Sequence, residues 1–305
     1  MKYIKTFSDT VEVSQVALGC MRIADMSDKE MDLYLNNAVE LGYNYFDHAD
    51  IYGGGKCEEV FGKALKRNPS LKDKIIIQTK CSIKPGIYDF SKEHIISAVE
   101  GSLKRLGTDS VDVLLLHRPD LLMEPDEVAE AFDILEGQGK VKHFGVSNHS
   151  PMQIELLKKS VKQKLSINQM QLSITNASMI SSGANVNLCN EDGINRDGYL
   201  RDYCRLNGIT IQPWSPMQYG FFEGCFVDNE KFPELNRVLK EIADKYSVST
   251  TTMAIAWILR HPAKMQPITG TTNLTRLADC IKASDIRITH DEWYQIYLAA
   301  GNKLP

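Results

Sequence analysis

The stretch Val111-Asp112-Val113-Leu114-Leu115-Leu116-His117 is typical of a buried strand that ends in a polar residue. Its apolar run is too short for a helix, and a nearly continuous apolar run characterises a parallel strand that is covered on both faces. Similar short runs occur at seven other places in the chain, namely residues 16–18, 45–46, 75–77, 141–146, 165–170, 209–214 and 265–269.

Between these runs lie amphipathic patterns that predict helices. The first predicted helix begins with Ser27 and Glu30, which have the spacing of a capping box, and it stops at Gly42. The second begins at Ser91, and Gly107 supplies its stop. Further helical patterns cover residues 125–138, 151–159, 199–207, 233–246, 251–260 and 274–283.

Eight strand-like runs that alternate with helical segments predict an α/β fold, a (β/α)₈ TIM barrel. The alternative, an open doubly wound sheet, is disfavoured because no GxGxxG motif follows the first run. No linker-like tract divides the chain, so residues 1–305 are predicted to form a single domain. We also expect an N-terminal β-hairpin of residues 3–6 and 11–13 on the barrel floor, a long loop at 173–198 and an extra C-terminal helix near 291–300.

Composition excludes several classes of protein. The 35 Lys and Arg residues against 39 Asp and Glu leave a net charge of −4, without the basic excess typical of proteins that bind nucleic acid or an anionic membrane. The apolar runs are too short to cross a bilayer, and no signal-peptide core follows Met1. Seven widely spaced cysteines, without a CxxC pair, indicate reduced thiols in a cytoplasmic protein rather than a zinc site.

Polar and aromatic residues follow nearly every predicted strand. Active sites of TIM barrels lie at the carboxyl ends of the strands, so we expect these residues to meet at one rim of the barrel. Any one of them could merely terminate a strand, but the whole set favours a site. The set comprises Asp47, Tyr52, Lys80, His117, Ser147, Asn148, Gln169, Trp214, Ser215, Gly270, Thr271 and Thr272.

Four of these residues suit the reduction of a carbonyl group. The phenol of Tyr52 is a weak acid, and a neighbouring Lys80 ammonium is expected to lower its pKa. Asp47 can hold the lysine by a charge-assisted hydrogen bond, and His117 can orient the substrate oxygen or relay a proton. Such a group of side chains protonates the alkoxide that develops when a carbonyl accepts hydride.

Several stretches resemble the aldo-keto reductase superfamily. They follow one another in the order that the family shows, and they are residues 43–53 (YNYFDHADIYG), Lys80, 116–119 (LHRP), 144–148 (FGVSN), 168–169 (NQ), 213–216 (PWSP) and 270–273 (GTTN). The sequence His-Ala-Asp-Ile-Tyr-Gly-Gly at residues 48–54 is similar to a bacterial branch of oxidoreductases. The resemblance implies that Tyr52 is the general acid, that Lys80 and Asp47 tune it, and that His117 orients the substrate.

The same resemblance implies a nicotinamide cofactor. Ser147, Asn148 and Gln169 would bind its carboxamide, and Trp214 would stack on its ring. The remaining cofactor-binding residues that the resemblance implies are Gly19, Met21, Asp47, Ser215, Pro216, Met217, Gly270, Thr271, Thr272, Arg276 and Asp279.

The expected cofactor depends on one departure from the family pattern. Many members carry a lysine at the place of Gly270, where it meets the 2′-phosphate, and here Arg276 is the fixed positive charge of that loop. Because a guanidinium can bind phosphate through two hydrogen bonds and stack on adenine, we expect NADP(H), with NAD(H) as the alternative. The expected partner is a small-molecule aldehyde or ketone, which would be reduced to an alcohol.

Two other functions are compatible with the same barrel. A lyase or aldolase would form a Schiff base on Lys80, although a neighbouring Asp47 carboxylate keeps a lysine charged and poorly nucleophilic. A cofactor-sensing regulatory subunit without catalytic activity is the other alternative.

Other residues near the predicted rim are expected to be structural. His143 and His149 lack the spacing of a zinc motif, and Cys57 and Cys81 lack an activating neighbour. An aromatic segment after the seventh run could equally form an apolar substrate wall or pack a loop on the barrel. Its members are Tyr219, Phe221, Phe222 and Phe226.

Overall fold

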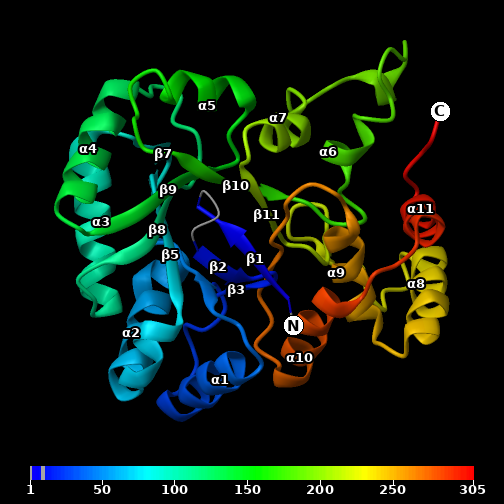
Figure 1. Cartoon of the computed structure of the whole chain (residues 1–305), viewed down its shortest axis with the longest axis horizontal. Coiled ribbons are helices and arrows are strands. Elements are labelled where there is room, and N and C mark those ends of the chain that lie inside the picture. Colours follow the sequence, from blue (N-terminus) through cyan, green and yellow to red (C-terminus); the bar gives the residue numbers. More distant parts are fainter. Residues whose placement is uncertain (1, 8–10) are drawn as a thin grey trace.

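The computed structural model describes residues 2–7 and 11–305 and shows eight parallel strands surrounded by helices (Figure 1). The strands pair in the order β11-β10-β9-β8-β5-β4-β3-β14, and a parallel bridge between Ile211 and Met265 brings the two ends of the sheet together. The prediction of a TIM barrel is therefore confirmed. The strands are β3 (Ala17–Gly19), β4 (Tyr45–Asp47), β5 (Ile76–Cys81), β8 (Val111–Leu116), β9 (Val141–Ser147), β10 (Leu165–Gln171), β11 (Thr210–Trp214) and β14 (Ile268–Thr269).

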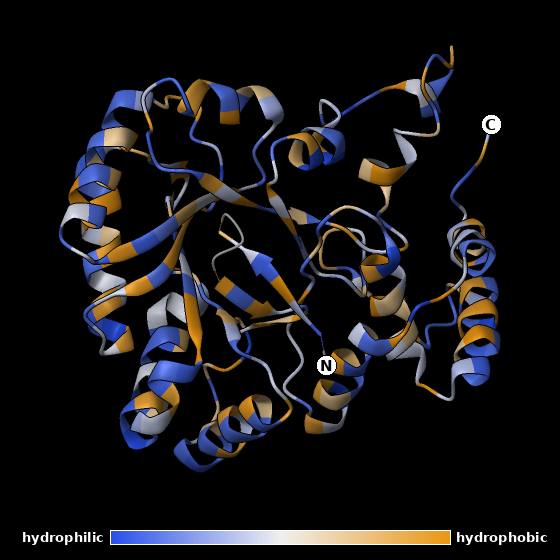
Figure 2. Ribbon diagram, in the orientation of Figure 1, coloured by the Kyte–Doolittle hydropathy of each residue, from blue (hydrophilic) through white to orange (hydrophobic). Residues whose placement is uncertain are grey.

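Amphipathic helices cover the outside of the barrel, and Figure 2 shows both hydrophilic and hydrophobic residues on them. The expected capping box of Ser27 and Glu30 is present at the start of the first helix. The outer helices are α1 (Asp28–Glu40), α2 (Lys56–Arg67), α3 (Lys92–Leu106), α4 (Pro125–Gly137), α5 (Pro151–Leu157), α7 (Leu200–Leu206), α8 (Pro233–Tyr246), α9 (Thr250–Arg260), α10 (Leu274–Lys282) and α11 (His290–Ala299). The extra C-terminal helix is thus present as α11.

An antiparallel hairpin of β1 (Tyr3–Thr6) and β2 (Val11–Ser14) lies across the ring of strands in Figure 1. One buried cluster joins the hairpin to the barrel strands. It includes Val13 of the hairpin, Phe7 just after β1 and Leu115 of β8. The hairpin therefore closes the floor of the barrel, as expected. Residues 8–10, which join its two strands, lie outside the described residues.

The eighth strand is shorter than predicted. Regular pairing covers only Ile268 and Thr269, because Pro267 has no N–H to donate to the ladder. Residues just before the proline close the barrel instead, and the N–H of Gln266 donates to the carbonyl of Ile211 at 2.9 Å.

The segment 173–198 is a long excursion from the barrel that contains the short helix α6 (Ser178–Ser181) and the 3₁₀ turn Glu191–Gly193 (Figure 1). The hydroxyl of Tyr297 on α11 and that of Ser181 are 2.8 Å apart, which ties the segment to the C-terminal helix. Residues of the segment line a second cavity beside α11, of about 410 Å³, and not the cavity at the strand ends.

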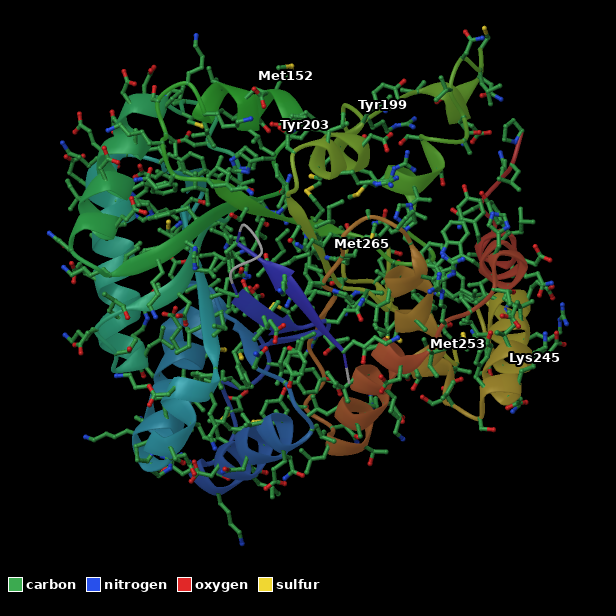
Figure 3. All side chains as sticks on the ribbon, in the orientation of Figure 1. Met152, Tyr199, Tyr203, Lys245, Met253 and Met265 are labelled. Carbon is green, nitrogen blue, oxygen red and sulfur yellow. The ribbon has the colours of Figure 1, made fainter. Side chains whose placement is uncertain are left out.

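Side-chain contacts also connect neighbouring outer helices. Figure 3 shows Met152 of α5 and Tyr203 of α7 at the same edge of the molecule, and the Tyr203 hydroxyl is hydrogen-bonded to the Glu155 carboxylate of α5.

Two small hairpins project near the strand ends, β6 (Ile83–Lys84) with β7 (Ile87–Tyr88) and β12 (Gln218–Tyr219) with β13 (Gly224–Cys225). Among the described helices, none combines the length and apolar character needed to cross a membrane.

Candidate active site

A cavity of about 690 Å³ opens at the carboxyl ends of the strands, a volume typical of small-molecule sites. Two of the predicted site residues do not line it. Lys80 is fully buried below it, and Asp279 lies one turn beyond Arg276 on α10, with its carboxylate 3.8 Å from Lys282. The predicted residues that do line the cavity are Gly19, Met21, Asp47, Tyr52, His117, Ser147, Asn148, Gln169, Trp214, Ser215, Pro216, Met217, Gly270, Thr271, Thr272 and Arg276.

Lys80 is the centre of a buried polar network below the cavity. Its Nζ lies 2.8 Å from Oδ1 of Asp47, 2.6 Å from the carbonyl oxygen of His48 and 3.2 Å from the hydroxyl of Tyr52. These contacts use all three N–H donors of the ammonium. Because the Tyr52 oxygen accepts from Lys80, the Tyr52 O–H is free to donate into the cavity.

The pKa values of the pair differ in part from the expectation. Burial alone would lower the pKa of Lys80, but Asp47 and Tyr52 raise it above its ordinary value. Lys80 lowers the pKa of Tyr52, as expected, but burial raises it more, so the pKa of the phenol lies above its ordinary value. The phenol is therefore protonated at neutral pH, and the lysine charge acts by stabilising the phenolate after a proton has left.

His117 stands beside Tyr52 at the cavity wall. The two rings meet edge to face, with their centroids 6.1 Å apart. Burial, together with the charges of Lys80 and Arg118, lowers the pKa of His117 well below its ordinary value. The imidazole is consequently neutral and has one N–H to donate to a substrate oxygen. Among the described residues, its Nδ1 has no hydrogen-bond partner.

The backbone that presents Tyr52 requires glycine. Residues 53–55 are three consecutive glycines with φ of 58°, 63° and 92°, a left-handed conformation that side chains disfavour. A Cβ on Gly55 would lie 2.8 Å from the side chain of Arg105. The Arg105 guanidinium in turn pairs at 2.8 Å with Glu58, which is fully buried. This ion pair supports the tyrosine loop from below, and no motif in the sequence predicts it.

Amide and hydroxyl side chains form the opposite wall of the cavity. The Asn148 amide donates to Ser147 Oγ at 2.8 Å, and the Trp214 indole N–H donates to Asn148 Oδ1 at 3.2 Å. Asn148 and Ser215 adopt φ of 60° and 52°, which is uncommon for residues other than glycine. Such backbone strain occurs preferentially at functional sites, where it aims particular side chains at a ligand.

A chain of buried glutamines continues the network away from Lys80. Gln78 and Gln169 both donate to Asp47 Oδ1, at 2.5 and 3.1 Å, and both also donate to Gln212. Gln212 donates to Gln266 at 2.9 Å. Only Gln169 was predicted from the sequence. The usable signal for the other three was an amide inside an otherwise apolar run, where a buried polar group needs a partner.

Three arginines at the cavity have no carboxylate partner among the described residues. They are Arg22, Arg118 and Arg276, whereas the lining carboxylate of Asp47 is already paired with Lys80. Only Arg276 was predicted. Arg22 Nη1 donates to the carbonyl of Gly270 at 3.3 Å and would lie 2.7 Å from a Cβ at that position. Glycine at position 270 thus makes room for Arg22, a pairing of distant residues that only the fold reveals.

The N-terminus of α10 faces the same cavity. Asn273 caps this nine-residue helix by accepting from the N–H of Arg276 at 3.0 Å, and Thr271 accepts from the N–H of Asn273 at 3.2 Å. Thr271, Thr272 and Asn273 all line the cavity. A helix N-terminus with neighbouring hydroxyl groups and an unpaired guanidinium is suited to bind phosphate.

The aromatic residues after β11 serve both expected roles, since one lines the cavity and others pack the loop on the barrel. Phe222 lines the cavity and stacks on Trp214, with ring centroids 5.7 Å apart and an interplanar angle of 21°. Phe226 is fully buried, and Tyr219 packs on Phe232, so both anchor the loop. Phe221, at the tip of the β12–β13 hairpin, is largely exposed.

The histidines and cysteines that were expected to be structural, His143, His149, Cys57 and Cys81, make packing or backbone contacts or are buried thiols. His143 stacks on Phe7, and Nδ1 of His149 is 2.9 Å from the carbonyl of Ser147. Burial raises the pKa of the thiols of both Cys57 and Cys81, so neither is an activated nucleophile. In the described part of the chain, no three His, Cys, Asp or Glu side chains are grouped so as to hold a metal ion.

Because several histidines are buried and neutral, the folded protein should lose stability as the pH falls. Burial lowers the pKa of His48 to about 3 and that of His149 to about 4, whereas an unfolded histidine binds a proton near pH 6.5. The unfolded state therefore binds more protons below pH 6.5, and the free energy of unfolding should fall between pH 6.5 and 4, by about 1.4 kcal/mol per pH unit for each histidine. Urea unfolding at several pH values measures this. His48→Leu should reduce the slope, and His290→Gln, at the exposed start of α11, should not; equal slopes in all three proteins would contradict the assignment.

Comparisons with known proteins show the family to which the chain belongs. The Aldo/keto reductase family model matches residues 15–299. The chain is 35% identical to an uncharacterised oxidoreductase, YcsN, of Bacillus subtilis (98% of each chain) and 35% identical to a 6-dehydroglucose reductase of Agrobacterium fabrum (97% of each chain). It also superposes on the crystal structure of a thermostable aldo-keto reductase bound to the inhibitor epalrestat, with a TM-score of 0.79, 26% identity and coverage of 98% of this chain and 100% of the other. The chain therefore belongs to the aldo/keto reductase family of oxidoreductases.

Proposed function

We propose that this enzyme reduces an aldehyde or ketone to an alcohol with NADPH as the hydride donor. The observation that carries the proposal is the 3.2 Å contact between Lys80 Nζ and the Tyr52 hydroxyl, directly below a cavity that Tyr52 and His117 line. A protonated phenol backed by a buried ammonium is a general acid poised for a developing alkoxide.

The residues at the cavity fit a phosphorylated nicotinamide cofactor. The N-terminus of α10, with Thr271, Thr272 and Arg276, would hold its phosphates. Asn148 and Gln169 carry the amide groups that would bind its carboxamide. Trp214 would stack on its ring in the place that the Phe222 ring occupies here. When bound, the cofactor supplies the hydride.

The side chains of this enzyme then supply the proton and the orientation. Neutral His117 donates a hydrogen bond to the substrate carbonyl oxygen and directs it toward Tyr52. Tyr52 transfers its hydroxyl proton to that oxygen as negative charge develops there. Lys80 stabilises the resulting phenolate, and Asp47, held by Gln78 and Gln169, keeps the ammonium in place.

The burial of Lys80 argues against a Schiff-base lyase. Its side chain is fully buried, makes three hydrogen bonds and does not line the cavity, so a substrate carbonyl has no path to Nζ. Borohydride trapping of an adduct on Lys80 would favour the lyase. Tight NADPH binding without turnover of any carbonyl compound would favour the regulatory subunit.

We further propose that the chain forms one domain and acts in the cytoplasm. All seven cysteines are free thiols, and five of them are buried. Free thiols are typical of proteins in a reducing compartment.

Steady-state kinetics tests the proposed function. NADPH oxidation should be followed at fixed enzyme concentration against aldehydes, ketones and quinones. The panel should include 6-dehydroglucose, because a relative with 35% identity is named as its reductase. Turnover of at least one carbonyl compound, with an alcohol as the product, is the expected result.

Cofactor choice gives a separate prediction. Arg276→Ala should weaken NADPH binding by roughly tenfold or more and NADH binding much less, because a charge-assisted contact contributes about 1.5–3 kcal/mol. Arg22→Ala should act in the same direction, since its guanidinium lies at Gly270, the position at which the family resemblance implies a phosphate-binding lysine. Equilibrium titration of both cofactors with each variant measures the effect. Equal losses for NADPH and NADH would refute the assignment of these residues to the 2′-phosphate.

A further inference from the structure

Arg118 is a charged residue of the cavity that the proposed chemistry does not use. It directly follows His117 at the end of β8, and its guanidinium lies over the ring of Trp214, 5.6 Å from the centroid. Only its backbone forms hydrogen bonds with described residues, both with Ser82 Oγ. The guanidinium is therefore held on an aromatic face, and its N–H groups are available to a ligand.

The barrel topology separates Arg118 from the proposed phosphate site. In the ring β11-β10-β9-β8-β5-β4-β3-β14, the strand β8 stands opposite β14, whichever way the ring is followed. Arg276 and the N-terminus of α10 follow β14, and Arg22 follows the adjacent strand β3. Phosphates bound by those residues lie on the far side of the mouth from Arg118. Arg118 instead directly follows His117, one of the two groups that face the substrate, and its charge acts on that imidazole.

The charge balance of the cavity points to an anion on the substrate side. Asp47 is neutralised by Lys80, and His117 is uncharged, so Arg118 faces no compensating charge there. The surrounding cavity wall is mainly apolar and includes Ile51 and Ile83. A guanidinium in such surroundings binds a carboxylate strongly, because two parallel charge-assisted hydrogen bonds match its planar fork.

We propose that Arg118 binds a carboxylate on the carbonyl substrate, so that the preferred substrates are aldehyde acids or keto acids. This inference rests on the proposed function and specifies its substrate class. Arg118 would bind the acid group while His117 and Tyr52 act on the carbonyl oxygen.

The test compares acids with their uncharged esters. NADPH oxidation is measured with glyoxylate, succinic semialdehyde and longer aldehyde acids, each beside its methyl ester. For at least one chain length, kcat/KM of the acid should exceed that of the ester by about tenfold or more, the usual effect of a charge-assisted contact. Arg118→Met should abolish this preference, mainly by raising KM for the acid, and Arg118→Lys should retain part of it. Arg22→Met, which removes the same charge on the cofactor side, should leave the acid-to-ester ratio unchanged.

Several outcomes would overturn the inference. These are equal kcat/KM for acids and esters, a preference for acids that survives in Arg118→Met, or a neutral polyhydroxy aldehyde that exceeds every acid. Calorimetric titration of the enzyme–NADPH complex with succinate separates this inference from the proposed function. Succinate binding that is lost in Arg118→Met supports the carboxylate site even if no aldehyde is turned over, whereas reduction of esters without any acid preference or succinate binding supports the reductase and refutes the carboxylate site.

Discussion

Tyr52→Phe should bind NADPH nearly as well as the parent enzyme and lose most of its turnover. The substitution removes one hydroxyl whose oxygen accepts from Lys80 at 3.2 Å, and it leaves the ring and its loop in place. A positioned general acid contributes about 10²–10⁴-fold to the rate, so kcat should fall by a factor in that range. The measurement is kcat with one good aldehyde, with NADPH affinity determined separately from quenching of protein fluorescence.

A matched variant identifies which group supplies the proton. His117→Phe removes the neighbouring imidazole, whose ring centroid lies 6.1 Å from that of Tyr52. If Tyr52 is the acid and His117 the orienting residue, both variants lose activity, but Tyr52→Phe keeps the substrate affinity that His117→Phe loses. Retained turnover in Tyr52→Phe together with none in His117→Phe would transfer the role of acid to His117.

Lys80→Met should lower both the turnover rate and the free energy of unfolding. Removal of the ammonium leaves the carboxylate of Asp47 buried without its counter-charge, and breaking a buried ion pair destabilises a protein by about 3–5 kcal/mol. That loss is a large part of a typical folding free energy of about 5–15 kcal/mol. Turnover should fall as well, because the phenolate of Tyr52 loses its stabilising charge. Urea unfolding and kcat measure the two effects.

The double variant Asp47→Asn with Lys80→Met separates the loss of stability from the loss of turnover. It removes both charges, so the free energy of unfolding should recover by about 1–4 kcal/mol relative to Lys80→Met, while activity stays low. Because this variant should fold more stably than the single one, it tests the catalytic role of the Asp47–Lys80 pair even if Lys80→Met does not fold. A double variant that is no more stable than Lys80→Met would show that the ion pair is not the source of the loss.

Much of the fold follows from local patterns in the sequence. The apolar run at 111–116 became β8, and Ser27 with Glu30 forms the capping box that begins α1. These features depend on near neighbours in the chain, since side-chain burial on both faces defines a parallel strand and cap residues define a helix end. The exception at Pro267 has an equally local cause, because proline cannot donate to the strand ladder.

The positions of Asp47, Tyr52, Lys80 and His117 were also predictable, because residues at the carboxyl ends of barrel strands must meet at one rim. The sign of the pKa shift of Tyr52 was not, because it depends on how completely the phenol is buried relative to the charge of Lys80. Desolvation is a property of the packed barrel, and spacing along the chain carries no measure of it.

The sequence by itself thus determined the barrel and most of the side chains at its mouth. Only the tertiary structure decided which distant residues act together. Arg22 and Gly270 are 248 residues apart, yet the guanidinium of one fills the space left by the other. Gln78, Gln212 and Gln266 likewise join into one buried chain because the closed barrel brings β5, β11 and the segment before β14 together. Hydrogen bonds and charge contacts of this kind depend on distances of a few ångströms between separate strands, which closure of the barrel alone establishes.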